Sequence, residues 1–134
     1  MDETILVLDD NYDFLTNIEL ILEMEGYRVL AARSSAEALA LLKQTTPDLI
    51  ISDIMMPEMD GYEFYQHVRQ SPELLSIPFI FLTAKGDRED IRFGKRLGVD
   101  DYLTKPLEPN DLLIAVESKL RRLREIKASS RQED

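Results

Sequence analysis

Five short strand-like runs, spread along the whole chain, restrict the possible folds more than any other feature of the sequence. They cover residues 4–9, 27–32, 48–53, 77–84 and 100–105. In most of these runs apolar residues follow one another instead of alternating with polar ones. Continuous apolar runs of this length are typical of strands that are buried on both faces. The runs therefore predict the strands of a covered sheet.

The stretches between these runs show apolar residues at helical spacing. Leu15, Ile18 and Leu22 share one face of the first such stretch, which ends near Gly26. A second predicted helix begins at Ser34 or Ser35, and two more cover residues 61–70 and 87–97. The last one begins near Pro109 or Asn110. Strands that alternate with helices pair in parallel through right-handed crossovers. We therefore predict an α/β fold, a doubly wound five-stranded parallel sheet with helices on both faces.

The composition is that of a single globular domain. The chain has 134 residues, of which 44% are apolar and 31% charged, and this length fits one domain. It contains no cysteine, which excludes disulfide bonds and thiolate metal sites. No apolar run approaches the roughly 20 residues of a membrane-spanning helix, and the acidic start lacks the basic region of a signal peptide. We expect a cytoplasmic protein without a membrane partner.

Charge is distributed unevenly along the chain. The net charge is −10, but the segment 119–134 has six basic and three acidic residues, so the first 118 residues carry −13. Phosphate contacts need a cationic surface, so the net negative charge leads us to expect no direct nucleic-acid binding by this chain. We predict one domain over residues 1–125 and a basic, polar tail or linker over 126–134.

The last predicted helix has two open interpretations. Val116, Leu120 and Leu123 are spaced by four and three residues, the start of a heptad pattern that Ile126 extends. A pattern this short fits a helix packed on the sheet. It also fits a dimer stalk, and hence a homodimer, or a linker to an output domain.

Polar residues stand where the predicted strands end. They comprise three carboxylates, a hydroxyl and an ammonium, from Asp9, Asp10, Asp53, Thr83 and Lys105. In doubly wound sheets, ligands bind outside the carboxyl ends of the strands. A carboxylate at the end of a buried strand is costly unless it reaches solvent or a cation. We therefore interpret Asp53 as the floor of a site.

The residue types at these ends favour phosphoryl chemistry. Carboxylates brought together repel one another unless a cation lies among them. Oxygen ligands without histidine or cysteine suit Mg²⁺. A phosphoryl group on Asp53 would be neutralised by Mg²⁺, Lys105 and the Thr83 hydroxyl, and phosphoryl transfer requires little else from a protein. Asp53 is thus a candidate nucleophile that forms an acyl phosphate.

Four motifs, in this order, resemble the receiver domain of bacterial two-component response regulators over about residues 5–123. They are DD at Asp9, DIMMPEMDG at Asp53, TA at Thr83 and KP at Lys105. Each motif alone is a weak signal, but all four fall at predicted strand ends. The resemblance implies the flavodoxin-like arrangement of the sheet, with strand order 2-1-3-4-5. It also implies a phosphorylation-driven switch that receives its phosphoryl group from a sensor histidine kinase or a phosphotransfer protein. Such a switch controls an output domain or target protein, and it turns over no external substrate.

The resemblance also implies which residues hold the metal and the phosphoryl group. Asp53 would be the phosphoacceptor. Asp10 and Asp53 would bind Mg²⁺ directly and Asp9 through water, with the backbone carbonyl of Met55 as a further ligand. Met55 and Lys85 would tune the lifetime of the acyl phosphate.

A further set of implied roles concerns the switch. Thr83 and Tyr102 match a pair in which the hydroxyl moves toward the phosphoryl group while the ring turns inward. This movement would alter the surface of the fourth helix, fifth strand and fifth helix. Lys105 would contact a phosphoryl oxygen, and its peptide bond to Pro106 would be cis.

Other interpretations compete with these roles. Asp9 and Asp10 could cap the first helix, Asp53 could begin an Asx turn, and Tyr102 could be plain core. At the level of function, the chain could be a pseudo-receiver that acts unphosphorylated as a docking module. It could also be a receiver cut from a larger regulator or a hybrid kinase.

Overall fold

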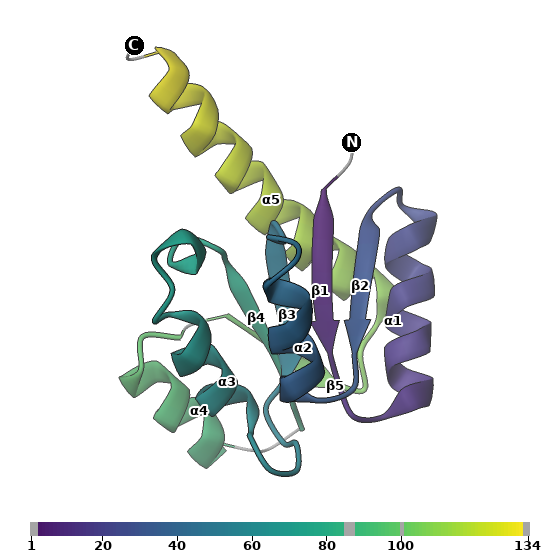
Figure 1. Ribbon diagram of the computed structural model, residues 1–134. Coiled ribbons are helices and arrows are strands. Elements are labelled where there is room, and N and C mark those ends of the chain that lie inside the picture. Colours follow the sequence, from purple (N-terminus) through teal and green to yellow (C-terminus); the bar gives the residue numbers. More distant parts are fainter. Residues whose placement is uncertain (1–2, 85–87, 100, 133–134) are drawn as a thin grey trace.

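The structure is a computed structural model that describes residues 3–84, 88–99 and 101–132, and in it strands and helices alternate along the chain (Figure 1). The strands are β1 (Thr4–Leu8), β2 (Arg28–Ala32), β3 (Leu49–Asp53), β4 (Phe79–Ala84) and β5 (Tyr102–Lys105). The helices are α1 (Tyr12–Met24), α2 (Ser35–Leu42), α3 (Gly61–Val68), α4 (Arg88–Arg96) and α5 (Pro109–Gln132), with a short 3-10 helix at Pro72–Leu74.

The strands form one parallel sheet in the order β2-β1-β3-β4-β5. The chain moves outward from β1 to β2, returns past β1 to β3, and then continues to β4 and β5. This reversal places a topological switch point between β1 and β3, where ligands of doubly wound sheets bind. The predicted fold class and strand order are confirmed.

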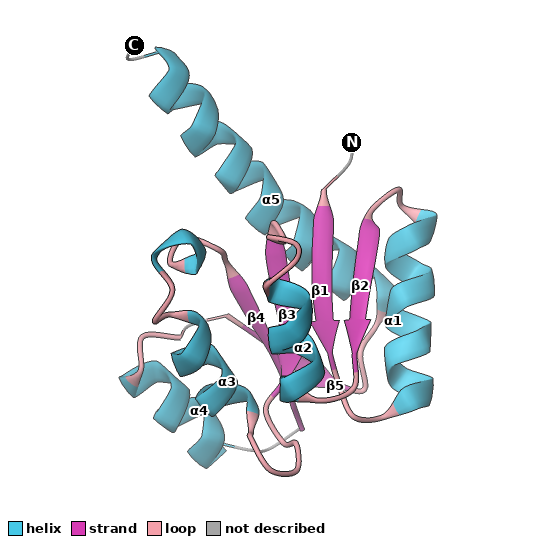
Figure 2. Cartoon of the chain, viewed as in Figure 1, coloured by secondary structure: helices cyan, strands magenta, loops and turns pink. Residues whose placement is uncertain are grey.

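Side chains that alternate along the buried strands form two hydrophobic clusters, one on each face of the sheet. Ile5 and Val7 of β1 pack in the cluster that α1 and α5 cover. Leu6 and Leu8 point to the opposite cluster, which includes residues of α2 and α3. Helices therefore cover both faces, as Figure 2 shows, and α4 lies beside α3 at the edge of the second layer. Burial on both faces explains the continuous apolar runs of the sequence.

Local signals fix where the helices begin and end. The side chains of Asn11, Ser34 and Asp60 accept hydrogen bonds from backbone N–H groups in the first turns of α1, α2 and α3. Gly26 and Gly98 follow α1 and α4 with φ angles of 94° and 95°, and glycine adopts this left-handed conformation without strain. The expected helix ends near these two glycines are confirmed.

The last helix is longer than the sequence patterns indicated. α5 continues through Gln132, so the predicted boundary between residues 125 and 126 falls inside a helix, and the division into domain and tail stays a prediction. Leu112, Val116 and Leu120 are fully buried on the sheet, whereas Ile126 is 55% exposed. Figure 1 shows the far end of α5 extending beyond the sheet. Within the described residues, no helix combines the length and the apolar character that crossing a membrane requires.

Candidate functional site

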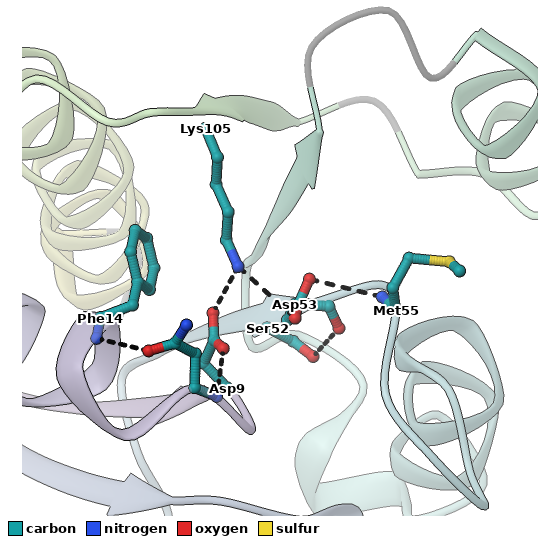
Figure 3. A network of polar contacts seen from close by, with 7 residues as sticks. Asp9, Phe14, Ser52, Asp53, Met55 and Lys105 are labelled. Carbon is teal, nitrogen blue, oxygen red and sulfur yellow. Dashed lines mark hydrogen bonds and ion pairs between the residues drawn. The ribbon is translucent and has the colours of Figure 1, made fainter.

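The carboxyl ends of three strands bring the predicted charged residues together at one edge of the sheet. Asp9 directly follows β1, Asp53 ends β3, and Lys105 ends β5. The Nζ atom of Lys105 lies 2.8 Å from Oδ2 of Asp9 and 3.5 Å from Oδ2 of Asp53 (Figure 3). Residues from three separate parts of the chain thus converge at the switch point of the sheet.

Asp9 is fully buried and has partners for both carboxylate oxygens. Its Oδ2 atom accepts from Lys105, and its Oδ1 atom accepts from the backbone N–H of Asn11 at 2.9 Å. The cap of α1 is Asn11, whose side chain accepts from the backbone N–H of Phe14 at 3.0 Å. The alternative in which Asp9 or Asp10 caps this helix is therefore wrong, and Asp9 faces the site.

Asp53 is a buried carboxyl group that lacks full compensation of its charge. Asp53 is 7% exposed, and its Oδ1 atom accepts from the backbone N–H of Met55 at 3.4 Å. Burial, followed by repulsion from Asp9, raises the pKa of Asp53 from 3.8 to about 6, although Lys105 and the Met55 N–H act in the opposite direction. The contact with Met55 is that of an Asx turn, so this local role coexists with the position in the site.

Asp9, Asp10 and Asp53 form a group that could hold a metal ion. One carboxylate oxygen from each lies within 4.8 Å of the others. Lys105 supplies one positive charge for three carboxylates, so its ammonium alone does not balance the negative charge of the group. A small divalent cation with oxygen ligands fits this arrangement, and Mg²⁺ has that preference. Asp10 is exposed, so the site is open to solvent on its side.

Gly61, the first residue of α3, fixes how this helix approaches Asp53. A Cβ atom on Gly61 would lie 2.2 Å from the backbone oxygen of Asp53. The Gly61 N–H donates to the Ile54 carbonyl at 2.8 Å, and Asp60 and Glu63 close a capping box at the start of the helix. This close approach holds the loop after β3 against the strand end.

Thr83 is buried near the end of β4. Its hydroxyl donates to the carbonyl of Ala84 at 3.4 Å, and its expected contact with a phosphoryl group stays a prediction. Lys85, which was expected to tune the acyl phosphate, lies outside the described residues.

Tyr102 points inward and takes part in a hydrogen-bond chain across three elements. Tyr62 of α3 donates to the Tyr102 hydroxyl at 3.0 Å, and that hydroxyl donates to the carbonyl of Ile91 in α4 at 3.4 Å. A Cβ atom on Gly94 would lie 1.8 Å from the Tyr102 oxygen and 2.5 Å from the Tyr62 oxygen. The two hydroxyls therefore occupy the space that the missing side chain of Gly94 leaves. Sequence reasoning did not find Tyr62 or Gly94.

Lys105 has surroundings that the sequence analysis described only in part. Its peptide bond to Pro106 is cis, which is the isomer implied by the family resemblance. Its Nζ atom also lies 4.4 Å from the centre of the Phe14 ring. Phe14 was not predicted as a site residue, since nothing in its local sequence distinguishes it from a core position of α1.

The doubly wound parallel sheet makes the chain a flavodoxin-like protein, and the acidic cluster with its lysine lies at the switch point where such proteins bind ligands. The model of the response regulator receiver domain family matches residues 5–117. The chain belongs to this family, which serves two-component signalling, and the resemblance given by its motifs is confirmed.

Individual relatives agree with this assignment. The chain is 40% identical over 122 residues to the alkaline phosphatase synthesis transcriptional regulatory protein PhoP of Bacillus subtilis, covering 91% of this chain and 50% of PhoP. It is 43% identical over 113 residues to a 14.6 kDa uncharacterized protein of Leptolyngbya boryana, and the match covers 84% of this chain and 86% of that protein. The receiver domain of a signal transduction histidine kinase from Syntrophus aciditrophicus superposes with a TM-score of 0.82 at 38% identity. The superposition covers 89% of this chain and 90% of that domain.

These relatives differ in what accompanies the shared domain. The chain spans about half the length of PhoP and of several other curated relatives, but most of the protein from Leptolyngbya boryana. Membership of the family therefore identifies this part of the chain as a receiver domain, but it does not identify what the domain controls.

Proposed function

We propose that the chain is a phosphoacceptor switch and that Asp53 receives the phosphoryl group from a phosphohistidine of a sensor histidine kinase or phosphotransfer protein. The observation that carries this proposal is the position of the Asp53 carboxylate. It lies 3.5 Å from the Lys105 ammonium and shares an oxygen cluster with Asp9 and Asp10. A nucleophile, a fixed cation and a metal-binding edge are the parts that phosphoryl transfer requires.

In the proposed reaction, a carboxylate oxygen of Asp53 attacks phosphorus while the bond from phosphorus to the donor nitrogen breaks, and that nitrogen keeps the electron pair. Lys105 and the Thr83 hydroxyl would neutralise the phosphoryl oxygens. Asp10 and Asp53 would hold Mg²⁺ directly, Asp9 through water, and the Met55 carbonyl would complete the set. Bound Mg²⁺ would supply further charge neutralisation. Attack of water on phosphorus would later release phosphate and restore the carboxylate.

The proposed output is a change in the surface of α4, β5 and α5. Tyr102 joins β5 to α3 and α4 through hydrogen bonds, so movement of its ring would alter how these elements pack. Such a change would shift the population between two surface states and thereby the affinity for an output domain, a target protein or a second copy. PhoP is a transcriptional regulatory protein, and an output of this kind is one candidate.

Intact mass spectrometry after incubation with acetyl phosphate and Mg²⁺ tests the proposal. We expect a single phosphoryl adduct that disappears in the Asp53→Asn variant and in metal-free buffer. Asp13→Asn is the matched control, because Asp13 is an exposed carboxylate in the first turn of α1. An adduct that persists in Asp53→Asn would contradict the assignment of the phosphoacceptor. The lack of any adduct with the fold intact, also with histidine kinases as donors, would favour an unphosphorylated docking module.

A further inference from the structure

We propose that Phe14 is a positioning residue that holds the Lys105 ammonium at the site through the face of its ring. The consequence for reaction rate rests on the proposed function of Asp53, whereas the contact itself does not. Three groups surround the Lys105 Nζ atom: Asp9 Oδ2 at 2.8 Å, Asp53 Oδ2 at 3.5 Å and the Phe14 ring centre at 4.4 Å.

These three neighbours restrict the ammonium from different sides. In Figure 3 the Phe14 ring and the Asp53 carboxylate lie on opposite sides of the Lys105 ammonium, with Asp9 between them. The negative face of an aromatic ring attracts a cation within about 6 Å of its centre. The ring therefore offsets part of the hydration that the Lys105 ammonium loses when the ring displaces water. An aliphatic side chain of similar size could not do so. The side chain of Lys105 retains only 27% exposure.

Asp9 and Phe14 are held in one frame by the turn between β1 and α1. The backbone N–H of Asn11 donates to Asp9 Oδ1 at 2.9 Å, and the Asn11 side chain accepts from the Phe14 N–H at 3.0 Å. Phe14 is partly buried and packs against the hydrophobic cluster beneath α1 and α5. A short segment of the chain thus prepares both the anionic and the aromatic contact for a lysine that arrives 96 residues later.

This arrangement limits where the ammonium can move when Asp53 changes its charge. Without the ring, the flexible lysine side chain could turn away from Asp53 toward solvent while its stem stays in place. With the ring, the ammonium stays within reach of the oxygens of a group bound to Asp53. Phe14 would thereby preserve the charge neutralisation that phosphoryl transfer uses.

A double-mutant cycle separates this role from simple packing. In the wild-type background, Phe14→Leu should slow phosphorylation by acetyl phosphate about threefold to tenfold, and Phe14→Tyr should restore most of the rate. In a Lys105→Gln background, Phe14→Leu should have no further effect. Tyr12→Leu is the matched control, because it removes an aromatic ring that lies over Arg33 in the same turn of α1. Its rate should equal that of the wild type.

Two kinetic outcomes would overturn the proposal. One is equal slowing by Phe14→Leu in both backgrounds, which would indicate packing alone. The other is a wild-type rate in Phe14→Leu. Thermal unfolding of each variant confirms that the compared proteins are folded.

A structural readout decides the contact independently of phosphorylation. The ring current of Phe14 should shift the ε-methylene proton resonances of Lys105 upfield in the NMR spectrum. This shift should persist in Phe14→Tyr and vanish in Phe14→Leu. Its absence from the wild type would refute the contact. If no form of the protein accepts a phosphoryl group, the proposed function fails, and the NMR result still decides whether Phe14 holds Lys105.

Discussion

Asp53 combines two properties that usually exclude each other, deep burial and an ionisable carboxyl group. Its burial and the neighbouring Asp9 raise its pKa to about 6, so near neutral pH the folded protein holds a charge that destabilises it. Stability is commonly sacrificed where a reactive group must be kept ready. The consequence is measurable because the destabilisation depends on pH and on metal.

Asp53→Asn should stabilise the metal-free protein at pH 7.5 by about 1 to 3 kcal/mol. A carboxyl group whose pKa is raised from 3.8 to about 6 by folding favours the folded state below pH 3.8 and loses this contribution as the pH rises through 6. The gain from Asn should therefore shrink toward pH 4. Urea unfolding at both pH values in the presence of a chelator measures it. A gain that is the same at both values would show that Asp53 does not titrate as inferred.

Mg²⁺ should raise the free energy of unfolding of the wild type, because the acidic cluster exists only in the folded chain. At ten times the dissociation constant, the expected gain is about 1.4 kcal/mol. Asp10→Asn should abolish most of it, whereas the exposed Asp13→Asn should not. Thermal unfolding over a Mg²⁺ titration provides the measurement, with Ca²⁺-free buffer. Equal stabilisation of wild type and Asp10→Asn would place the ion elsewhere.

The loop between β3 and α3 depends on Gly61, whose role differs from that of Gly26 and Gly98, the glycines that follow α1 and α4. Gly61→Ala should lower the free energy of unfolding by about 2 kcal/mol or more, because the new Cβ would lie 2.2 Å from the Asp53 backbone oxygen. Gly26→Ala, with open space but a φ of 94°, should lower it by only about 1 kcal/mol. Urea unfolding compares the two. A smaller loss for Gly61→Ala would show that the loop yields without strain.

α4 rests on the two tyrosine hydroxyls through Gly94, so the usual effect of replacing a helical glycine should reverse. Alanine normally stabilises a helix by about 1 kcal/mol relative to glycine. Gly94→Ala should instead destabilise the protein by about 1 kcal/mol or more, because its Cβ would overlap with the Tyr102 and Tyr62 oxygens. Adding Tyr102→Phe should recover part of the loss, since it removes the nearer oxygen. Thermal unfolding of single and double variants tests this, and additive losses would speak against the overlap.

The sequence predicted those features that depend on local pattern and strand order. Continuous apolar runs located the strands, and the rule for strand ends placed Asp9, Asp53 and Lys105 at one edge of the sheet. The contacts of Phe14 with Lys105 and of Tyr62 with Tyr102 could not be predicted in this way. They join residues 91 and 40 positions apart, and their geometry depends on how helices pack on the sheet. The length of α5 could have been predicted, since the segment after Pro109 contains neither proline nor glycine, the residues that commonly end helices, through Gln132.

The molecule as a whole is a sandwich of two helical layers around a sheet, with one helix that exceeds its layer. The inner part of α5 is fixed by Leu112, Val116 and Leu120 beneath the sheet. Further along, Arg124 pairs with Glu3 near β1 and with Glu117 of its own helix. Beyond these contacts the side chains through 129 are exposed.

Two substitutions on α5 should distinguish its packed part from its extended part. Leu120→Ala should lower the free energy of unfolding by about 2 to 4 kcal/mol because it leaves a cavity under the sheet. Ile126→Ala should change it by less than about 0.5 kcal/mol in a monomer, because Ile126 is 55% exposed. Urea unfolding at several protein concentrations measures both. A large, concentration-dependent loss for Ile126→Ala would instead favour the dimer stalk.

The extended part of α5 has the geometry of a lever. From Leu120 to Gln132 the helix rises by about 18 Å, and its base packs on the same sheet that carries Asp53 and Lys105. A tilt of about 5° at that base would displace the tip by about 1.5 Å over this length. A small change of tilt at the base of α5, caused by a rearrangement near β5, would thus become a larger displacement at the tip.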